Sequence, residues 1–126
     1  MQTLQLPNGS WKSYLEQLTQ LKRGDRIAVE LGGGGLHPRC WAQKCPLVGV
    51  SAEVEDSQVA RIEVLAGDRG EVRKLAVSGP RELTLTERDD GSPVALQIHA
   101  SDGSFASLRF ETDELNLDVP PGAFLG

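Results

Sequence analysis

The side chains best suited to chemistry gather in one short segment of this chain, which holds His37, Cys40, Trp41 and Cys45. Zinc binds cysteine and histidine in tetrahedral sets, usually built from closely spaced pairs. This segment offers no second pair, and the other histidine, His99, lies far along the chain. We therefore expect no metal ion here, and no other cofactor.

The two cysteines could also form a disulfide across a loop. Thiols of cytosolic proteins stay reduced, however, so we expect Cys40 and Cys45 to be two ordinary thiols. A metal- or redox-responsive role for this pair is the last of three functions considered for the chain.

Trp41 is the residue of this segment that is best suited to bind a ligand. The segment from Leu36 to Lys44 lacks a regular apolar pattern, which predicts an irregular loop. A tryptophan in a loop beside polar groups is a natural binding element. The predicted ligand-binding residues are His37, Arg39 and Trp41. The alternative is that Trp41 folds back and caps the open end of the sheet.

Four consecutive glycines, Gly32 to Gly35, follow a predicted strand and so invite comparison with phosphate-binding loops. Such loops lead into a helix, whose N-terminal amides hold the phosphate. Here Leu36, His37 and Pro38 follow, and no helical pattern appears. The glycines therefore predict a flexible linker.

Catalytic constellations are sparse in this sequence. Neither the Gly-x-Ser-x-Gly elbow nor the His-Glu-x-x-His motif occurs, and two histidines give few options for general acid–base chemistry near neutral pH. Asp89, Asp90 and Asp102 occur in predicted turns, where aspartate is favoured because it bonds to nearby backbone. The sequence therefore favours a protein that is not an enzyme, and we assign no catalytic residue.

One helix is predicted over residues 8–23. Its apolar stripe contains Trp11, Tyr14 or Leu15, Leu18 and Leu21 at spacings of three or four. Asn8 or Ser10 could cap the first amides, and Gly24 suits the left-handed position that ends a helix. We expect the stripe to pack on a sheet.

Alternating apolar residues predict strands from about Arg61 to Phe110, with earlier strands at 26–31 and 46–52 and a last one near 115–119. Short Asp-Gly turns at 89–92 and 101–104 permit only antiparallel neighbours. The predicted fold class is α+β, mainly β. In it, an N-terminal helix packs on a strongly bent antiparallel meander or partly open barrel of about seven strands.

Composition limits the partners and the compartment. The 126 residues fit a single domain, residues 1–126, and carry a net charge of −5. Nucleic acid is excluded because its binding requires a basic surface. No stretch approaches the roughly 20 apolar residues that cross a membrane, and no secretory signal is evident. We therefore expect a cytoplasmic protein.

Several phrases together resemble a known family. They are Leu6-Pro7 before Trp11, Ala28-Val29-Glu30, Pro46-Leu47-Val48-Gly49-Val50, the run from Leu96 to Gly103, and Leu108-Arg109-Phe110. They resemble a family of small uncharacterised bacterial proteins, a domain of unknown function. The resemblance covers nearly the whole chain, and it implies no activity and no functional residues.

The sequence thus favours a non-enzymatic binding or protein-interaction module. A homodimer is expected, to which the apolar tail with Phe124 and Leu125 or an exposed strand edge contributes. The alternative is a small-ligand-binding or enzymatic barrel with its pocket near Trp41.

Overall fold

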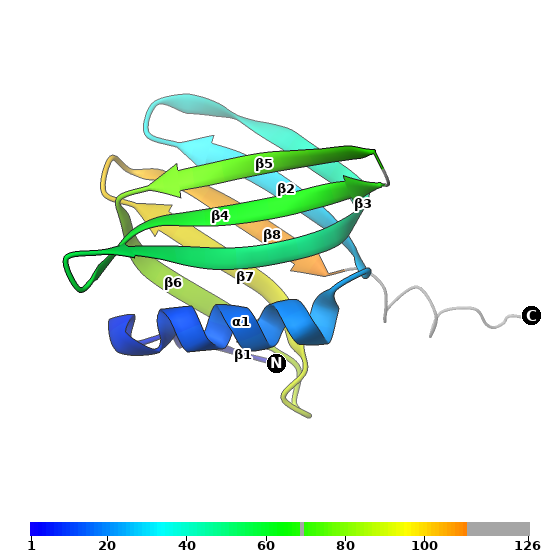
Figure 1. Cartoon of the computed structure of the whole chain (residues 1–126), viewed down its shortest axis with the longest axis horizontal. Helices are drawn as coiled ribbons and strands as arrows, with labels where there is room; N and C mark the ends of the chain where they lie inside the picture. Colours follow the sequence, from blue (N-terminus) through cyan, green and yellow to red (C-terminus); the bar gives the residue numbers. More distant parts are fainter. Residues whose placement is uncertain (69, 111–126) are drawn as a thin grey trace, which may run out of the picture.

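The chain folds around one antiparallel sheet of eight strands (Figure 1). The computed structural model describes residues 1–68 and 70–110. The elements are β1 (Gln2–Gln5), a 3₁₀ turn (Asn8–Ser10), α1 (Trp11–Lys22), β2 (Arg26–Gly33), β3 (Leu36–Glu55), β4 (Gln58–Asp68), β5 (Glu71–Ser78), β6 (Pro80–Glu87), β7 (Pro93–Ala100) and β8 (Ser104–Phe110).

The strand order is β1-β6-β7-β8-β2-β3-β4-β5, and the sheet does not close into a barrel. The predicted fold class, an N-terminal helix on a strongly bent and open antiparallel sheet, is confirmed. Within this sheet, β2–β5 and β6–β8 form two meanders that join where β8 pairs with β2. Strand β1 was not predicted, and the strand expected near 115–119 lies outside the described residues.

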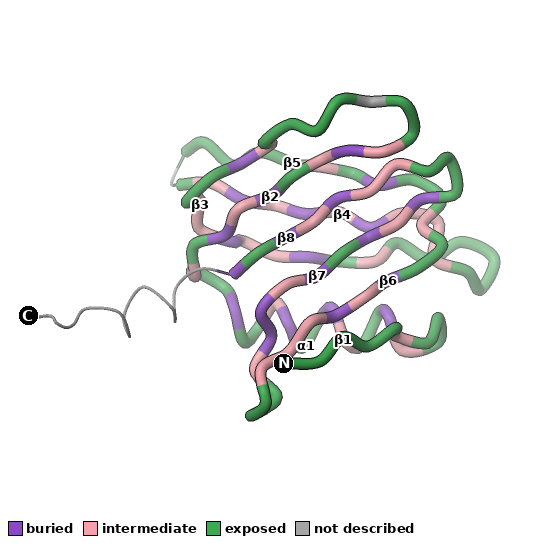
Figure 2. Tube along the Cα trace, turned by 180° about the vertical axis from the view of Figure 1, so that it is seen from behind, coloured by how far each residue is buried: buried purple, intermediate pink, exposed green. Residues whose placement is uncertain are grey.

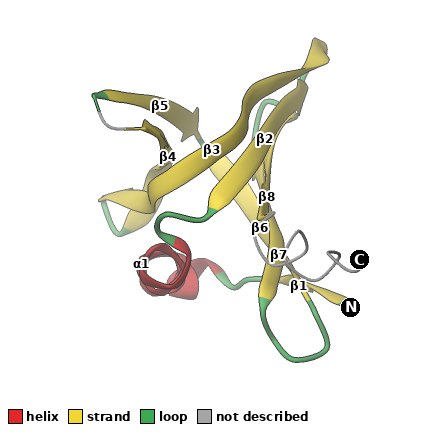
Figure 3. Cartoon of the chain, turned by 90° about the vertical axis from the view of Figure 1, so that its right-hand side faces the viewer, coloured by secondary structure: helices red, strands yellow, loops and turns green. Residues whose placement is uncertain are grey.

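The bend of the sheet is made by β3, which is 20 residues long. Its first half pairs with β2 and its second half pairs with β4, with register shifts on both sides of the corner. The second half of β3, β4 and β5 form the front layer of Figure 1, and the remaining strands form the back layer (Figure 3).

The irregular loop expected from Leu36 to Lys44 is therefore wrong, since this segment is the first half of β3. Among the described strands, this half has a paired neighbour on one side only, which leaves room for Pro38. Lys44, with a φ of 54°, marks the irregular corner. Pairing with β2 thus overrides the weak local pattern.

The glycine run is not a flexible linker. Gly32 and Gly33 belong to β2, and Gly34 and Gly35 form the turn into β3. A Cβ added at Gly32 would lie 2.9 Å from Cζ of Phe105, and one at Gly33 would overlap the carbonyl oxygen of Gly103. The glycines are needed because this turn packs against the β7–β8 turn.

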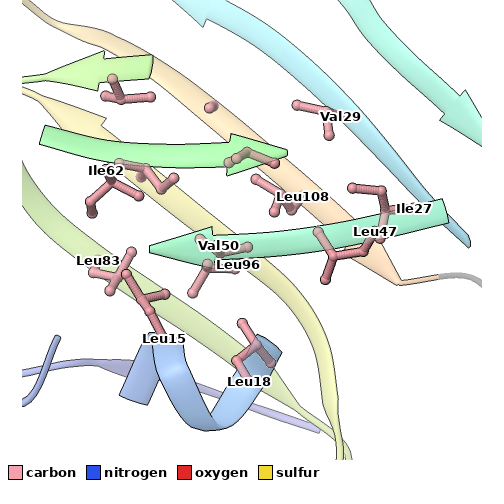
Figure 4. Packing of buried hydrophobic residues seen from close by; sticks show 14 of the residues in the cluster. Leu15, Leu18, Ile27, Val29, Leu47, Val50, Ile62, Leu83, Leu96 and Leu108 are labelled. Carbon is pink, nitrogen blue, oxygen red and sulfur yellow. The ribbon is translucent and has the colours of Figure 1, made fainter. Parts of the chain in front are cut away.

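The two layers and α1 enclose a hydrophobic core (Figure 4). Leu15 and Leu18 enter it from α1, Ile62 from the front layer, and Leu83 and Leu96 from the back layer. Each of these side chains is at most 1% exposed. Full burial of one such side chain stabilises the fold by about 1.5–3 kcal/mol.

The helix buries a slightly different stripe from the predicted one. Trp11, Leu15 and Leu18 are buried as predicted, but Leu21 is 64% exposed and Lys22 is only 5% exposed. The spacing of four, three and four residues keeps Lys22 on the core side of α1. Its Nζ lies 5.5 Å from the ring centroid of Phe110 and 3.7 Å from Oδ2 of Asp25.

The ends of α1 agree with the prediction in one case of two. Gly24 has a φ of 91°, so the left-handed position after the helix is confirmed. Ser10 is the N-cap, but its hydroxyl donates to the carbonyl of Pro7 at 2.8 Å and caps no helix amide. The predicted capping bond is therefore wrong.

The helix also covers the edge of β3 that faces away from β4. The hydroxyl of Thr19 donates to the carbonyl oxygen of Val50 and accepts a bond from its amide, each at 2.9 Å. Gly49 permits this approach, because an added Cβ would lie 3.4 Å from Cγ2 of Thr19. One side chain thus replaces a neighbouring strand.

Candidate functional site

The outer side of the back layer is a broad surface that no described element covers (Figure 2). Its strands alternate, so Leu83, Leu85, Leu96 and Ile98 point into the core and their neighbours point outward. The outward set includes the charged residues Arg26 and Glu82, toward the ends of β2 and β6. We call its central part the polar sheet face. It comprises Thr3, Gln5, Ala28, Glu30, Thr84, Thr86, Ala95, Gln97, Ser107 and Arg109.

Strand register arranges these residues in two rows across the back layer. One row runs Gln5, Thr84, Gln97, Ser107, Glu30, and the other runs Thr3, Thr86, Ala95, Arg109, Ala28. Most side chains in both rows are small or uncharged. At the rim, Phe105 packs over Gly32, with its ring centroid 6.1 Å from that of His99.

The charged residues of the polar sheet face are Glu30 and Arg109, which lie on the neighbouring strands β2 and β8. Glu30 is opposite Ser107 and Arg109 is opposite Ala28, so the two are diagonal neighbours. Such positions are roughly 7–8 Å apart. Among the described residues, neither side chain forms an ion pair or a hydrogen bond.

A shallow hollow of about 240 Å³ lies between these two charges. It is lined by Ala28, Val29, Glu30, Cys40, Gln43, Ser107 and Arg109. The small side chain of Ala28 leaves the space open. A carboxylate, a guanidinium and an amide therefore converge on a depression where charges of either sign could be received.

The outer side of the front layer differs in its charges. We call its outward set, Ser51, Glu53, Arg61, Glu63, Leu65, Lys74 and Ala76, the charged sheet face. Arg61 pairs with Glu53, and its Nε lies 3.4 Å from Oε2 of Glu63 without hydrogen-bond geometry. Nζ of Lys74 lies 3.6 Å from the same Glu63 oxygen. Positive and negative side chains therefore lie next to one another on this face.

The predicted ligand-binding residues lie on the first half of β3. His37 and Arg39 are exposed, whereas Trp41 is half-buried against the core. The guanidinium carbon of Arg73 lies 4.5 Å from the Trp41 ring centroid, and Nη1 of Arg73 donates to the Trp41 carbonyl oxygen at 2.7 Å. This packing agrees with the alternative in which Trp41 folds back onto the end of the sheet.

No hydrogen bond or ring contact within the described residues joins Trp41 to His37 or Arg39. Ligand binding by these three residues stays a prediction. Arg73 was not anticipated as the partner of Trp41, because only the bend of β3 brings it near.

Both cysteines are free thiols. Cys40 is exposed and its Sγ donates to the carbonyl oxygen of Ala42 at 3.2 Å, while Cys45 is half-buried. Within the described part of the chain, no group of three His, Cys, Asp or Glu side chains is close enough to hold a metal ion.

A second cavity, of about 410 Å³, lies where α1 begins. It is lined by Asn8, Gly9, Trp11, Lys12, Val54, Ser57, Gln58, Val59 and Pro80. Asp56 and Ser57, in the adjacent turn between β3 and β4, both have positive φ, at 51° and 65°. Its lining combines apolar and polar groups in similar measure, and its volume is in the range of sites for small organic molecules.

The groups with shifted pKa values, Tyr14, Asp90 and Asp102, lie in the helix and in turns, outside the polar sheet face. Side-chain and backbone hydrogen bonds from Ser92 lower the pKa of Asp90, and those from Ser104 lower the pKa of Asp102. Both aspartates lie in turns, as predicted. Burial, helped by the charge of Glu87, raises the pKa of Tyr14 to about 12.

The polar sheet face was missed at the sequence level. A signal was available, since the outward positions Thr84, Thr86, Ala95, Gln97 and Ser107 carry no charge. The alignment of these positions across β1, β6, β7, β8 and β2 was not available, because it depends on long-range register.

No helix within residues 1–68 and 70–110 has the length and apolar character needed to cross a bilayer. No curated protein matches the chain. No solved structure matches it either. The model of one protein family, described as a family of unknown function, matches residues 2–119, in agreement with the resemblance seen in the sequence. The chain therefore belongs to the family of unknown function DUF5335.

Proposed function

We propose that this protein is a non-enzymatic interaction module that binds a protein partner on the polar sheet face. The observation that carries the proposal is the low number of charged side chains at the centre of a broad face left uncovered by the described elements. Protein interfaces are depleted of charged side chains at their centre, whereas ordinary exposed surface is rich in them. The charged sheet face of the same molecule supplies that ordinary pattern.

A flat sheet face can bind a partner without rearrangement of the backbone. Its side chains are held by strand pairing and by the core beneath, so little conformational entropy is lost on binding. Thr, Ser and Gln supply hydrogen bonds, and Ala28 and Ala95 allow close approach. Glu30 and Arg109 would set the orientation of the partner.

Position-specific cross-linking in the cells of origin tests this proposal. A photoreactive residue replaces Gln97 on the polar sheet face or, as the matched control, Ala76 on the charged sheet face. Both positions are exposed on strands. We expect a discrete protein adduct from position 97 and none from position 76. No adduct from position 97, or equal adducts from both, would refute the interaction module.

The second candidate function is small-ligand binding, now at the cavity where α1 begins. Its volume of about 410 Å³ lies in the range of small-molecule sites. A ligand library screened by thermal shift against the native chain and Val54→Trp, which fills the cavity, tests this idea. Stabilisation by a ligand that is lost in Val54→Trp would favour small-ligand binding over a protein partner.

The same screen on Trp41→Ala tests ligand binding by the predicted residues His37, Arg39 and Trp41.

We also propose a bacterial, cytoplasmic protein. Two free thiols, one of them exposed, suit a reducing compartment. Fractionation of the native cells checks the location.

A further inference from the structure

We propose that the partner on the polar sheet face is a second copy of this chain, related to the first by a two-fold axis that lies between the two faces. This inference rests on the proposed function and names its partner. In the dimer, Glu30 of one copy pairs with the partner's Arg109, and Arg109 pairs with the partner's Glu30.

Charge complementarity carries the inference. A two-fold interface applies the same patch to itself, so the patch must be self-complementary. The polar sheet face carries one anion and one cation side by side on adjacent strands. The two-fold axis lies in the plane of the interface and crosses the midpoint of the line from Glu30 to Arg109 at a right angle. It therefore brings Glu30 of each copy opposite Arg109 of the other copy. Since neither charge has an ion-pair partner among the described residues, both are available.

Side-chain size permits the close approach that such pairing requires. Packed sheets lie about 10 Å apart. Ala28 and Ala95 flank Arg109 in one row, and Ser107 lies beside Glu30 in the other. These small residues leave space beside the two charges. The hollow of about 240 Å³ gives each partner side chain a place to enter.

The area of the face sets the strength to be expected. Strands β2, β6, β7 and β8 have seven or eight residues each. Strand spacing of about 4.8 Å and a rise of about 3.3 Å per residue give roughly 500 Å² in plane, and β1 adds to this. A standard interface buries about 800 Å² per partner. We therefore expect a dimer with a dissociation constant in the micromolar range.

Sedimentation equilibrium of the full chain and of charge-reversal variants tests the dimer. Glu30→Arg places Arg against Arg in a homodimer, and Arg109→Glu places Glu against Glu. We expect each variant to dimerise at least tenfold more weakly than the native chain. Glu55→Arg, on the hairpin between β3 and β4, is the matched control and should dimerise as the native chain does.

Mixing the two variants gives the sharpest result. A heterodimer of Glu30→Arg with Arg109→Glu contains two pairs of opposite charge, so we expect association to recover in the mixture. The double variant should recover it within one chain. Circular dichroism checks that each variant is folded. If Glu30→Arg or Arg109→Glu does not fold, Glu30→Gln or Arg109→Gln, respectively, takes its place.

The outcomes separate this inference from the proposed function. A native chain that stays monomeric at 100 micromolar, a concentration well above about 1 micromolar, overturns the dimer. A dimer unaffected by both reversals, or a mixture that does not recover, also overturns it. If position 97 then cross-links to a different protein, the interaction module stands with another partner. If position 97 gives no adduct, both fail.

Discussion

The two outward faces of this sheet rest on the same kind of core but use charge differently. On the charged sheet face, Arg61 and Lys74 lie beside Glu53 and Glu63, so positive and negative groups are paired within the chain. On the polar sheet face, uncharged side chains surround Glu30 and Arg109, which form no ion pair within residues 1–68 and 70–110. The comparison teaches that the charged side chains of a sheet face can be paired within the chain or can be left for the opposite charges of a partner.

The largest effect should come from the hydrophobic core that lies beneath both faces. Leu96 is fully buried, and its neighbour Gln97 points outward on the polar sheet face. We expect Leu96→Ala to lower the free energy of unfolding by about 2–5 kcal/mol, since it leaves a cavity. Gln97→Ala should change it by less than about 0.5 kcal/mol. Urea unfolding measures both, and similar losses would mean that the two sides of β7 are not distinct.

The turn at the end of the back layer gives the next effect. We expect Gly33→Ala to lower the free energy of unfolding by at least about 2 kcal/mol, because it adds overlap to an unfavourable φ of 76°. Gly35→Ala, at a φ of 82° with open space around it, should cost only about 1–2 kcal/mol. Thermal unfolding compares the two variants. Equal losses would show that the contact with Gly103 is unimportant.

The edge of β3 on the front side provides a third test. Thr19→Val removes both hydrogen bonds to Val50 while keeping the shape of the side chain. We expect a loss of about 1–3 kcal/mol, since the backbone groups of Val50 become unsatisfied. Thr19→Ser, which keeps the hydroxyl, should retain most of the stability. Native-state hydrogen exchange at the Val50 amide should rise in Thr19→Val alone.

The smallest effect concerns the charged sheet face itself. Glu63→Gln removes the carboxylate that Arg61 and Lys74 share. Exposed pairs contribute little, so we expect a loss of about 0.2–1 kcal/mol that shrinks at high salt. Unfolding at low and high ionic strength measures this. Dimerisation should not change. If Glu63→Gln abolished dimerisation, the interface would lie on the charged sheet face instead of the polar sheet face.

Local pattern was enough to predict much of the fold. Alternation in the segments with Leu83 and Leu96 predicted strands with one buried side, and Asp-Gly turns predicted their antiparallel pairing. The stripe with Trp11, Leu15 and Leu18 predicted how α1 packs. Each of these signals arises within a few residues of chain, so no knowledge of distant contacts was needed.

The errors arise where distant contacts decide the structure. The first half of β3 has a weak strand pattern, yet pairing with β2 makes it a strand. Gly33 suggests flexibility until the β7–β8 turn is placed beside it. Lys22 is not part of the predicted apolar stripe, yet it is buried because its Nζ lies over the ring of Phe110 from β8. The polar sheet face depends wholly on register, so it could not be located from the sequence. The tail expected to aid dimerisation, with Phe124 and Leu125, lies outside the described residues.

The pairing of β2 with β8 has a consequence for how quickly the chain folds. This pairing joins Ile27 with Phe110 and Gly33 with Ser104, residues that are 83 and 71 positions apart in the sequence. The two meanders can form from local hairpins, but their union must close a long loop against its entropy. Chains dominated by such non-local pairs fold in milliseconds to seconds rather than microseconds. We therefore expect substitutions at the β2–β8 seam to slow refolding, whereas those in the β3–β4 hairpin should mainly speed unfolding.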